Sequence, residues 1–180
     1  MFAERGYAGA AVEEIVRRSR LSKGTFYWHY GGKDALFLDL IDDRIDRPTR
    51  DAIDTLRSDS EHPSADISVL LAQLFGRRRA TLVLLQEYAL AASRDQRLAE
   101  RYQQRLDGLR AHLAAALEAR HGATGVPLDV PAAELAEAFI ALADGLTVHA
   151  LTGSAAATPD LFGHIAALVY DGLVHRAQHD

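Results

Sequence analysis

The chain has 180 residues, of which 48% are hydrophobic and 25% charged, a composition that argues against an intrinsically disordered protein. It contains no cysteine, which excludes disulfide bonds and thiolate metal sites. The formal net charge of −5 disfavours a nucleic-acid partner at first sight. No apolar run approaches the ~20 residues of a membrane helix, so we expect a cytoplasmic protein with no membrane partner.

The charge is distributed unevenly along the chain. Residues 1–33 contain six Lys or Arg side chains and three Glu side chains, a net charge of +3, which leaves −8 for the remainder. Three charges are a weak signal alone. They nevertheless place any binding site for an anionic partner near the N-terminus.

The first predicted helix spans about residues 12–19. Its inward positions follow the spacing i, i+3, i+4, i+7, namely Val12, Ile15, Val16 and Ser19. On the opposite face, Glu13 and Arg17, and likewise Glu14 and Arg18, are expected to form i,i+4 ion pairs. The segment is therefore predicted to be a short amphipathic helix.

A second helix is predicted from Ser22, a favourable N-cap, to about Tyr30, where Gly31 and Gly32 end it. The turn at 19–21 separates it from the first helix. Two short helices joined in this way have the dimensions of a helix-turn-helix, whose second helix enters the major groove of DNA.

The second helix places its residues on two faces. At 100° per residue, Phe26 and Tyr30 point toward a core. The opposite side carries Gly24, Thr25 and Trp28, with Tyr27 and His29 beside them. An aromatic edge of a core is the alternative interpretation, and it leaves an outward tryptophan unexplained.

The outward side chains suit contact with DNA. Inside a helix, a glycine such as Gly24 is roughly 1 kcal/mol less favourable than alanine. Close approach of the backbone to another surface would explain its presence. Thr25 can contact a base or a thymine methyl group. Tyr27, His29 and Lys33 offer donors to phosphates.

Further helices are predicted at 33–57, 64–76, 79–92, 95–121, 131–152 and 159–177, with no convincing strand. We therefore predict an all-α fold, with a helix-turn-helix domain over 1–45 and a helical body over 46–180. No catalytic set emerges, and neither an enzyme, a cofactor nor a metal site is expected. The pair His175 and His179 has i,i+4 spacing at a terminus and is interpreted as solvated.

Ring-bearing side chains on the central helices could line a mostly apolar pocket with a few polar groups. These candidates are Phe75, Tyr88, Tyr102 and His112. Each of them could equally be an ordinary core residue.

The segment "FAERGYAGAAVEEIVRRSRLSKGTFYWHYGGKDALFLDLI" resembles the DNA-binding head of TetR-family transcriptional repressors, most specifically in "KGTFYWHY" followed by a lysine. Similarity is looser at 85–95 and 139–151. The resemblance implies that Lys23, Thr25 and Trp28 lie over bases. It also implies that Tyr27, His29 and Lys33 hold phosphates. A repressor released from a palindromic operator by a small-molecule effector is then expected.

The resemblance further implies a homodimer formed by the last two helices. The apolar stripes predicted to form its interface are Leu135, Phe139, Leu142, Leu146, His149, Phe162, Ile165, Val169 and Gly172. An intramolecular core is the alternative interpretation of the same stripes.

The sequence departs from the family pattern in its head. Most of the first helix of the family would precede "FAERGY" and is expected to be truncated here. Ala10 and Ala11 replace a usual capping hydroxyl, and Arg20 replaces the turn glycine. A dimeric small-molecule-binding protein with a weak DNA-binding head is therefore the alternative function.

Overall fold

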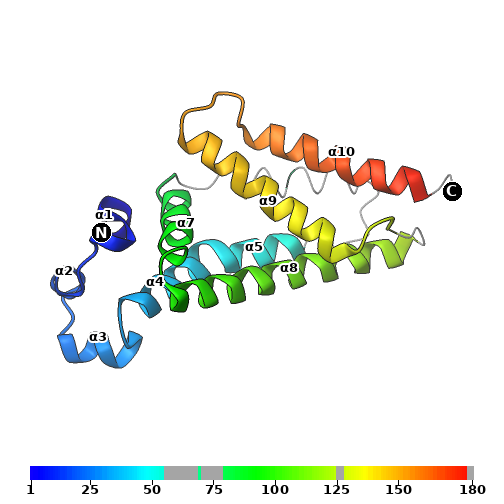
Figure 1. The fold of residues 1–180 in the computed structure, drawn as a ribbon. Coiled ribbons are helices and arrows are strands. Elements are labelled where there is room, and N and C mark those ends of the chain that lie inside the picture. The colour runs from blue at the N-terminus through cyan, green and yellow to red at the C-terminus, as the bar shows by residue number, and fades with distance from the viewer. Residues whose placement is uncertain (55–68, 70–78, 125–127, 178–180) are drawn as a thin grey trace. The chain divides into compact units, whose positions relative to one another are not determined.

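The computed structural model describes residues 1–54, 69, 79–124 and 128–177, which form helices and connecting loops and include no strand (Figure 1). The predicted all-α class is thereby confirmed. None of the helices in these ranges is long and apolar enough to cross a membrane. Apart from residue 69, the predicted helix at 64–76 lies outside the described residues.

The chain divides into two compact units, and the first contains the N-terminal helices. Unit 1 consists of Met1–Pro48 and Arg78–Gln103. Its helices are α1 (Phe2–Gly9), α2 (Val12–Ser19), α3 (Lys23–Tyr30), α4 (Lys33–Ile41) and α7 (Arg79–Ala92), with a π-helical turn, η1, at Asp42–Asp46.

Aromatic rings form the centre of unit 1. Phe37 of α4 makes edge contacts with Phe2 and Tyr7 of α1, at centroid distances of 5.1 and 4.9 Å. Tyr88 of α7 lies 5.3 Å from the same Phe37 ring. Such pairs add roughly 0.5–1.5 kcal/mol each beyond the burial of their area. Helix α7 therefore shares the core of the head, and unit 1 takes in more of the chain than the predicted 1–45.

Unit 2 consists of Thr49–Arg77 and Gln104–Asp180. Its described helices are α5 (Arg47–Asp54), most of α8 (Gln96–Thr124), α9 (Ala132–Leu151) and α10 (Pro159–Ala177). Fully buried alanines, at 116, 136 and 166, belong to the same core cluster as the larger side chains Leu117, Phe139 and Phe162. Small residues at these positions let the helix backbones approach closely.

Most of the predicted helix bounds agree with the structure. The predicted helices at 79–92 and 159–177 are confirmed, and those at 95–121 and 131–152 differ by three residues at most. The helix predicted from 33 to 57 continues without a break from α4 through η1 into α5. Sequence periodicity did not show the π-helical turn.

Candidate DNA-binding surface

Helix α3 has a side-chain cap at its start and a glycine at its end. The Ser22 hydroxyl accepts a hydrogen bond from the Thr25 N–H at 3.0 Å. Gly31 adopts the left-handed conformation at φ 67° and donates its N–H to the Tyr27 carbonyl. An N-cap of this kind contributes about 1 kcal/mol. Both bounds of the helix follow from these two residues, as the sequence predicted.

The two faces of α3 differ sharply in exposure. Phe26 is 1% exposed, whereas Trp28 is 82% exposed and Tyr27 is also on the surface. The Tyr30 ring lies 5.6 Å from Phe26 and is half-buried. The predicted orientation is therefore confirmed, with Phe26 and Tyr30 inward and Trp28 outward. Soluble proteins rarely leave a tryptophan ring so exposed without a partner.

Exposed polar side chains lie on the same helix as this tryptophan. His29 is exposed and stands edge-on to the Trp28 ring at 4.7 Å. The Thr25 hydroxyl is 2.8 Å from the hydroxyl of Ser22. Lys23 donates to Glu13 of α2 at 3.3 Å, in a pair exposed on both sides. Solvent screens such a pair, so it costs little to exchange for a phosphate or a base.

Lys33 differs from the other predicted contacts because it is half-buried. Its ammonium group donates to the carbonyl oxygen of Tyr7 at 3.1 Å and lies 4.6 Å from the centroid of the Tyr7 ring. The structure therefore orders this lysine at the start of α4. Its role as a phosphate contact remains a prediction.

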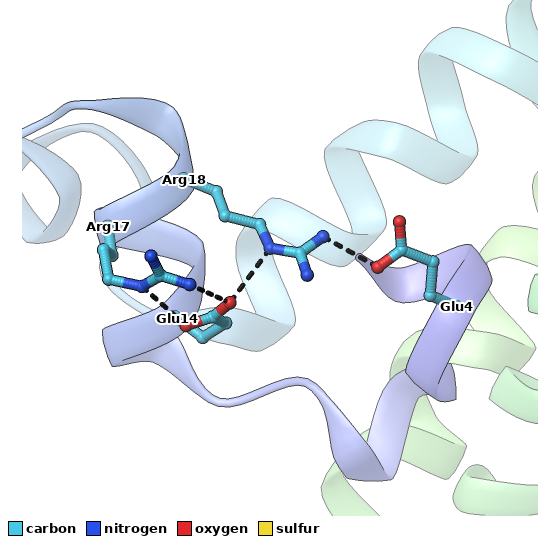
Figure 2. A network of polar contacts seen from close by, with 4 residues as sticks. All are labelled: Glu4, Glu14, Arg17 and Arg18. Atoms are coloured by element: carbon cyan, nitrogen blue, oxygen red, sulfur yellow. Dashed lines mark hydrogen bonds and ion pairs between the residues drawn. The ribbon is translucent and has the colours of Figure 1, made fainter.

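A network of charges links α2 to α1 (Figure 2). Glu14 accepts from Arg17 at 2.6 and 2.9 Å and from Arg18 at 3.0 Å, and Arg18 also reaches Glu4 at 2.7 Å. These hydrogen bonds lower the pKa of Glu14 to about 2, so its carboxylate is ionised at neutral pH. The predicted pair of Glu14 and Arg18 is confirmed.

The other predicted pair in α2 is wrong. Glu13 bonds to Lys23, and Arg17 bonds to Glu14 at i,i+3. Arg17 reaches Glu14 because a bidentate guanidinium fits a carboxylate well at this spacing. Both arginines of α2 are thus neutralised by acids of the same unit.

Arg20 occupies the turn between α2 and α3 in the left-handed conformation, at φ 58° and ψ 19°. It is the one non-glycine residue with positive φ in the described part of the chain. The side chain is exposed and forms no ion pair with a described residue. Backbone strain and an unneutralised cation therefore coincide in the turn of the helix-turn-helix.

Replacing Arg20 by glycine is expected to stabilise the protein relative to alanine at the same position. Both changes remove the guanidinium, but only glycine relieves the left-handed strain. The relief of strain is partly offset by the greater conformational freedom of glycine in the unfolded chain. The free energy of unfolding of the glycine variant should therefore exceed that of the alanine variant by roughly 0.5–1 kcal/mol. Urea denaturation of Arg20→Gly and Arg20→Ala measures this difference. Equal stabilities would show that the turn is not strained.

The predicted effector contacts fall into different parts of the chain. Tyr88 is fully buried in unit 1, with its ring 5.4 Å from that of Tyr102 and 6.3 Å from that of Tyr7. His112 belongs to unit 2, where its Nε2 atom lies 3.1 Å from Asp54. Phe75 lies outside the described residues. The structure therefore assigns Tyr88 to the core of unit 1, because protein rings enclose its side chain.

The predicted dimer stripes separate into buried and exposed residues. Leu135, Phe139 and Phe162 are buried within a single chain and form its core. The prediction that they face a partner is corrected, because the strongest apolar stripe of α9 serves the core of unit 2. Leu142, Leu146 and Ile165 are half-buried, whereas His149, Val169 and Gly172 are exposed.

The exposed faces of α9 and α10 carry apolar residues that the sequence analysis missed. Leu168 is 71% exposed and Val148 is 43% exposed. On α9, the outward positions Ala141 and Gly145 precede Val148 at helical spacing. Small residues give a weak periodic signal, which is why sequence patterns did not reveal this face.

Two family models match the chain. The model of bacterial regulatory proteins of the tetR family matches residues 1–40, which include α2 and α3. The model of the C-terminal part of BetI-type transcriptional repressors matches residues 63–175, more than half of the chain.

Two curated relatives match a short segment of the chain. The chain is 36% identical over 47 residues to the HTH-type transcriptional regulator YuxN of Bacillus subtilis, which is 26% of this chain. It is also 36% identical over 44 residues, 24% of its length, to the A-factor receptor protein of Streptomyces griseus. The aligned segment spans 16% of each of these proteins.

Solved structures share the fold along nearly the whole chain. A protein from Rhodococcus sp. described as a TetR-family regulator matches with a TM-score of 0.78 at 18% identity, covering 96% of this chain and 92% of that one. A transcriptional regulator from Saccharomonospora viridis, solved in complex with choline, matches with a TM-score of 0.69 at 19% identity, covering 94% and 89%. With both family models, these matches confirm the resemblance noted in the sequence: the chain belongs to the TetR family of DNA-binding transcriptional regulators.

Proposed function

We propose that the protein is a ligand-responsive repressor that binds a palindromic operator as a homodimer and leaves it when a small molecule binds. The observation that carries this proposal is the exposed tryptophan on a capped helix whose opposite face is buried. A regulatory role in the cytoplasm, rather than a catalytic one, accords with the family.

The proposal assigns roles to the outer face of α3. Thr25 and Trp28 contact bases, and Gly24 lets the backbone approach the groove. Packing within the chain does not require a glycine there, since an added Cβ would meet only the Ser22 hydroxyl at 3.7 Å. Lys23 exchanges Glu13 for DNA. The remaining contacts hold phosphates, namely Tyr27, His29 and Lys33.

We propose that the homodimer forms through the outward faces of α9 and α10. The exposed apolar side chains Val148 and Leu168 support this assignment. Gly145 and Gly172 face open space in the single chain, so a partner helix can approach closely there. Two-fold symmetry then presents two recognition helices to two half-sites of one operator.

We place the effector in unit 2, where His112 remains a candidate contact. Burial raises the pKa of Asp144 on α9, although Arg105 opposes the shift. A cationic effector would offset the cost of burying this carboxylate, and the choline complex of the Saccharomonospora viridis protein accords with that chemistry. A ligand can release DNA only if it binds the DNA-incompetent arrangement more tightly.

The function is tested by selecting duplexes from a random-sequence pool with the full-length chain. We expect the recovered sequences to share an inverted repeat and the affinity to fall steeply with salt concentration, since phosphate contacts release counterions. Changing Thr25 to alanine should relax base preference at one position of each half-site, at a cost of about 1–3 kcal/mol. A pool that shows no enrichment would contradict the proposal.

A further inference from the structure

Tyr7 is buried in unit 1, and each of its polar groups bonds to a different side chain. Its N–H donates to Oε2 of Glu87 on α7 at 2.6 Å, and its carbonyl accepts from Lys33 at 3.1 Å. Its hydroxyl donates to Asp34. Burial, together with this hydrogen bond, raises the pKa of Tyr7 above its ordinary value, so the hydroxyl remains protonated at neutral pH.

Gly6 makes room for the Glu87 carboxylate. Its backbone, at φ 70° and ψ 179°, lies in a region that is essentially restricted to glycine. A Cβ at this position would lie 2.1 Å from Oε2 of Glu87. The backbone of the Gly6–Tyr7 peptide is therefore shaped to receive a carboxylate from α7.

Lys33 depends on the same tyrosine for its position. The Tyr7 carbonyl and ring together hold the ammonium group, which forms no ion pair with a described residue. One ammonium proton is used by the carbonyl, so two donors remain for another acceptor. A lysine that is already ordered loses less side-chain entropy on binding a phosphate.

We propose that Glu87 is a positioning residue for the DNA contact of Lys33. By fixing the Tyr7 N–H, the Glu87 carboxylate restrains the chain next to Gly6, the residue there with the greatest backbone freedom. The Tyr7 carbonyl then keeps the direction that orders Lys33. Helix α7 thus controls a phosphate contact on α4. This inference rests on the proposed function, because it takes Lys33 to bind a phosphate.

The direction in which DNA affinity changes when the Glu87 carboxylate is removed separates this positioning role from simple electrostatics. Removing a carboxylate from a DNA-binding unit should tighten DNA binding, since the phosphates are negative. The positioning role predicts weaker binding instead. Glu100 of α8 is an exposed glutamate in the same unit, so Glu100→Ala is the charge-matched control.

The test measures duplex affinity at a series of salt concentrations, using full-length protein and a duplex selected by the wild-type chain. Glu87→Ala is expected to lose roughly 2- to 10-fold in affinity, the range for one side chain that is no longer pre-ordered. Its salt slope should stay close to that of the wild type, because Lys33 still pairs with its phosphate, whereas Lys33→Ala should lower the slope by about one. In a Lys33→Ala background, Glu87→Ala should cause no further loss. Glu87→Gln should retain near-wild-type binding, because the amide oxygen can still accept from Tyr7.

Additive losses in the double variant would overturn the inference and leave Glu87 a structural residue. If circular dichroism shows that Glu87→Ala does not fold, Glu87→Asp replaces it, since it keeps the charge but shortens the reach. The outcomes stated for Glu87→Ala then apply to Glu87→Asp. A wild-type chain that selects no duplex would overturn the proposed function and this inference together. Wild-type binding that Glu87→Ala leaves intact would overturn this inference alone.

Discussion

Replacing Phe26 by alanine is expected to unfold the helix-turn-helix and abolish duplex binding. The ring is 1% exposed and is the buried anchor of α3. Truncating a buried phenylalanine to alanine costs about 3–5 kcal/mol. That is a large part of the total stability of a typical domain, about 5–15 kcal/mol. Urea denaturation and duplex titration measure the two losses.

Trp28→Ala is the matched control, because it removes an aromatic ring two positions along the same helix. Its ring is 82% exposed, so stability should change by no more than about 0.5 kcal/mol. Duplex affinity should nevertheless fall by about 1–3 kcal/mol, the range for one base contact. If Trp28→Ala instead unfolded the protein while Phe26→Ala did not, the assignment of the two faces would be reversed.

Gly172→Glu is expected to convert the proposed dimer into a monomer and so to lose operator affinity. An added Cβ at Gly172 meets nothing within 4 Å, so the protomer itself tolerates a side chain there. Glutamate also favours a helix over glycine by roughly 0.5–1 kcal/mol. Any loss of the dimer must therefore come from a charge buried against the partner, which is strongly unfavourable. Sedimentation analysis gives the oligomeric state.

Gly108→Glu is the control for this substitution. Gly108 lies within α8, is exposed, and also faces open space. The same change there should leave both the dimer and duplex affinity intact. A Gly172→Glu protein that remained dimeric would move the interface to another face of the molecule.

The head was the part of the molecule most open to prediction from sequence. Ser22 and Gly31 have strong local preferences, and these preferences define both bounds of α3 without any tertiary contact. Helical geometry then placed Phe26 and Trp28 on opposite sides. Local rules sufficed because this helix has eight residues and both its caps are encoded in the adjacent sequence.

Features that depend on contacts distant in sequence were not predictable in the same way. The hydrogen bond from Tyr7 to Glu87 joins residues 80 positions apart, and no spacing rule relates them. The apolar stripe through Leu135 and Phe139 was predicted to face a partner because core and interface helices share one periodicity. Only burial within the single chain separates the two roles. The outward face of α9, with Ala141 and Gly145, gave almost no hydrophobic signal.

Trp28 emission provides the most direct test of the central claim that the outer face of α3 meets DNA. Because this is the only tryptophan in the chain, the fluorescence reports one position. In the free protein the ring should be open to quenching by acrylamide. On titration with a selected duplex, its emission should change and its quenching should fall, in step with the fraction of protein bound. A bound complex in which Trp28 keeps its emission and its full accessibility to acrylamide would contradict the account.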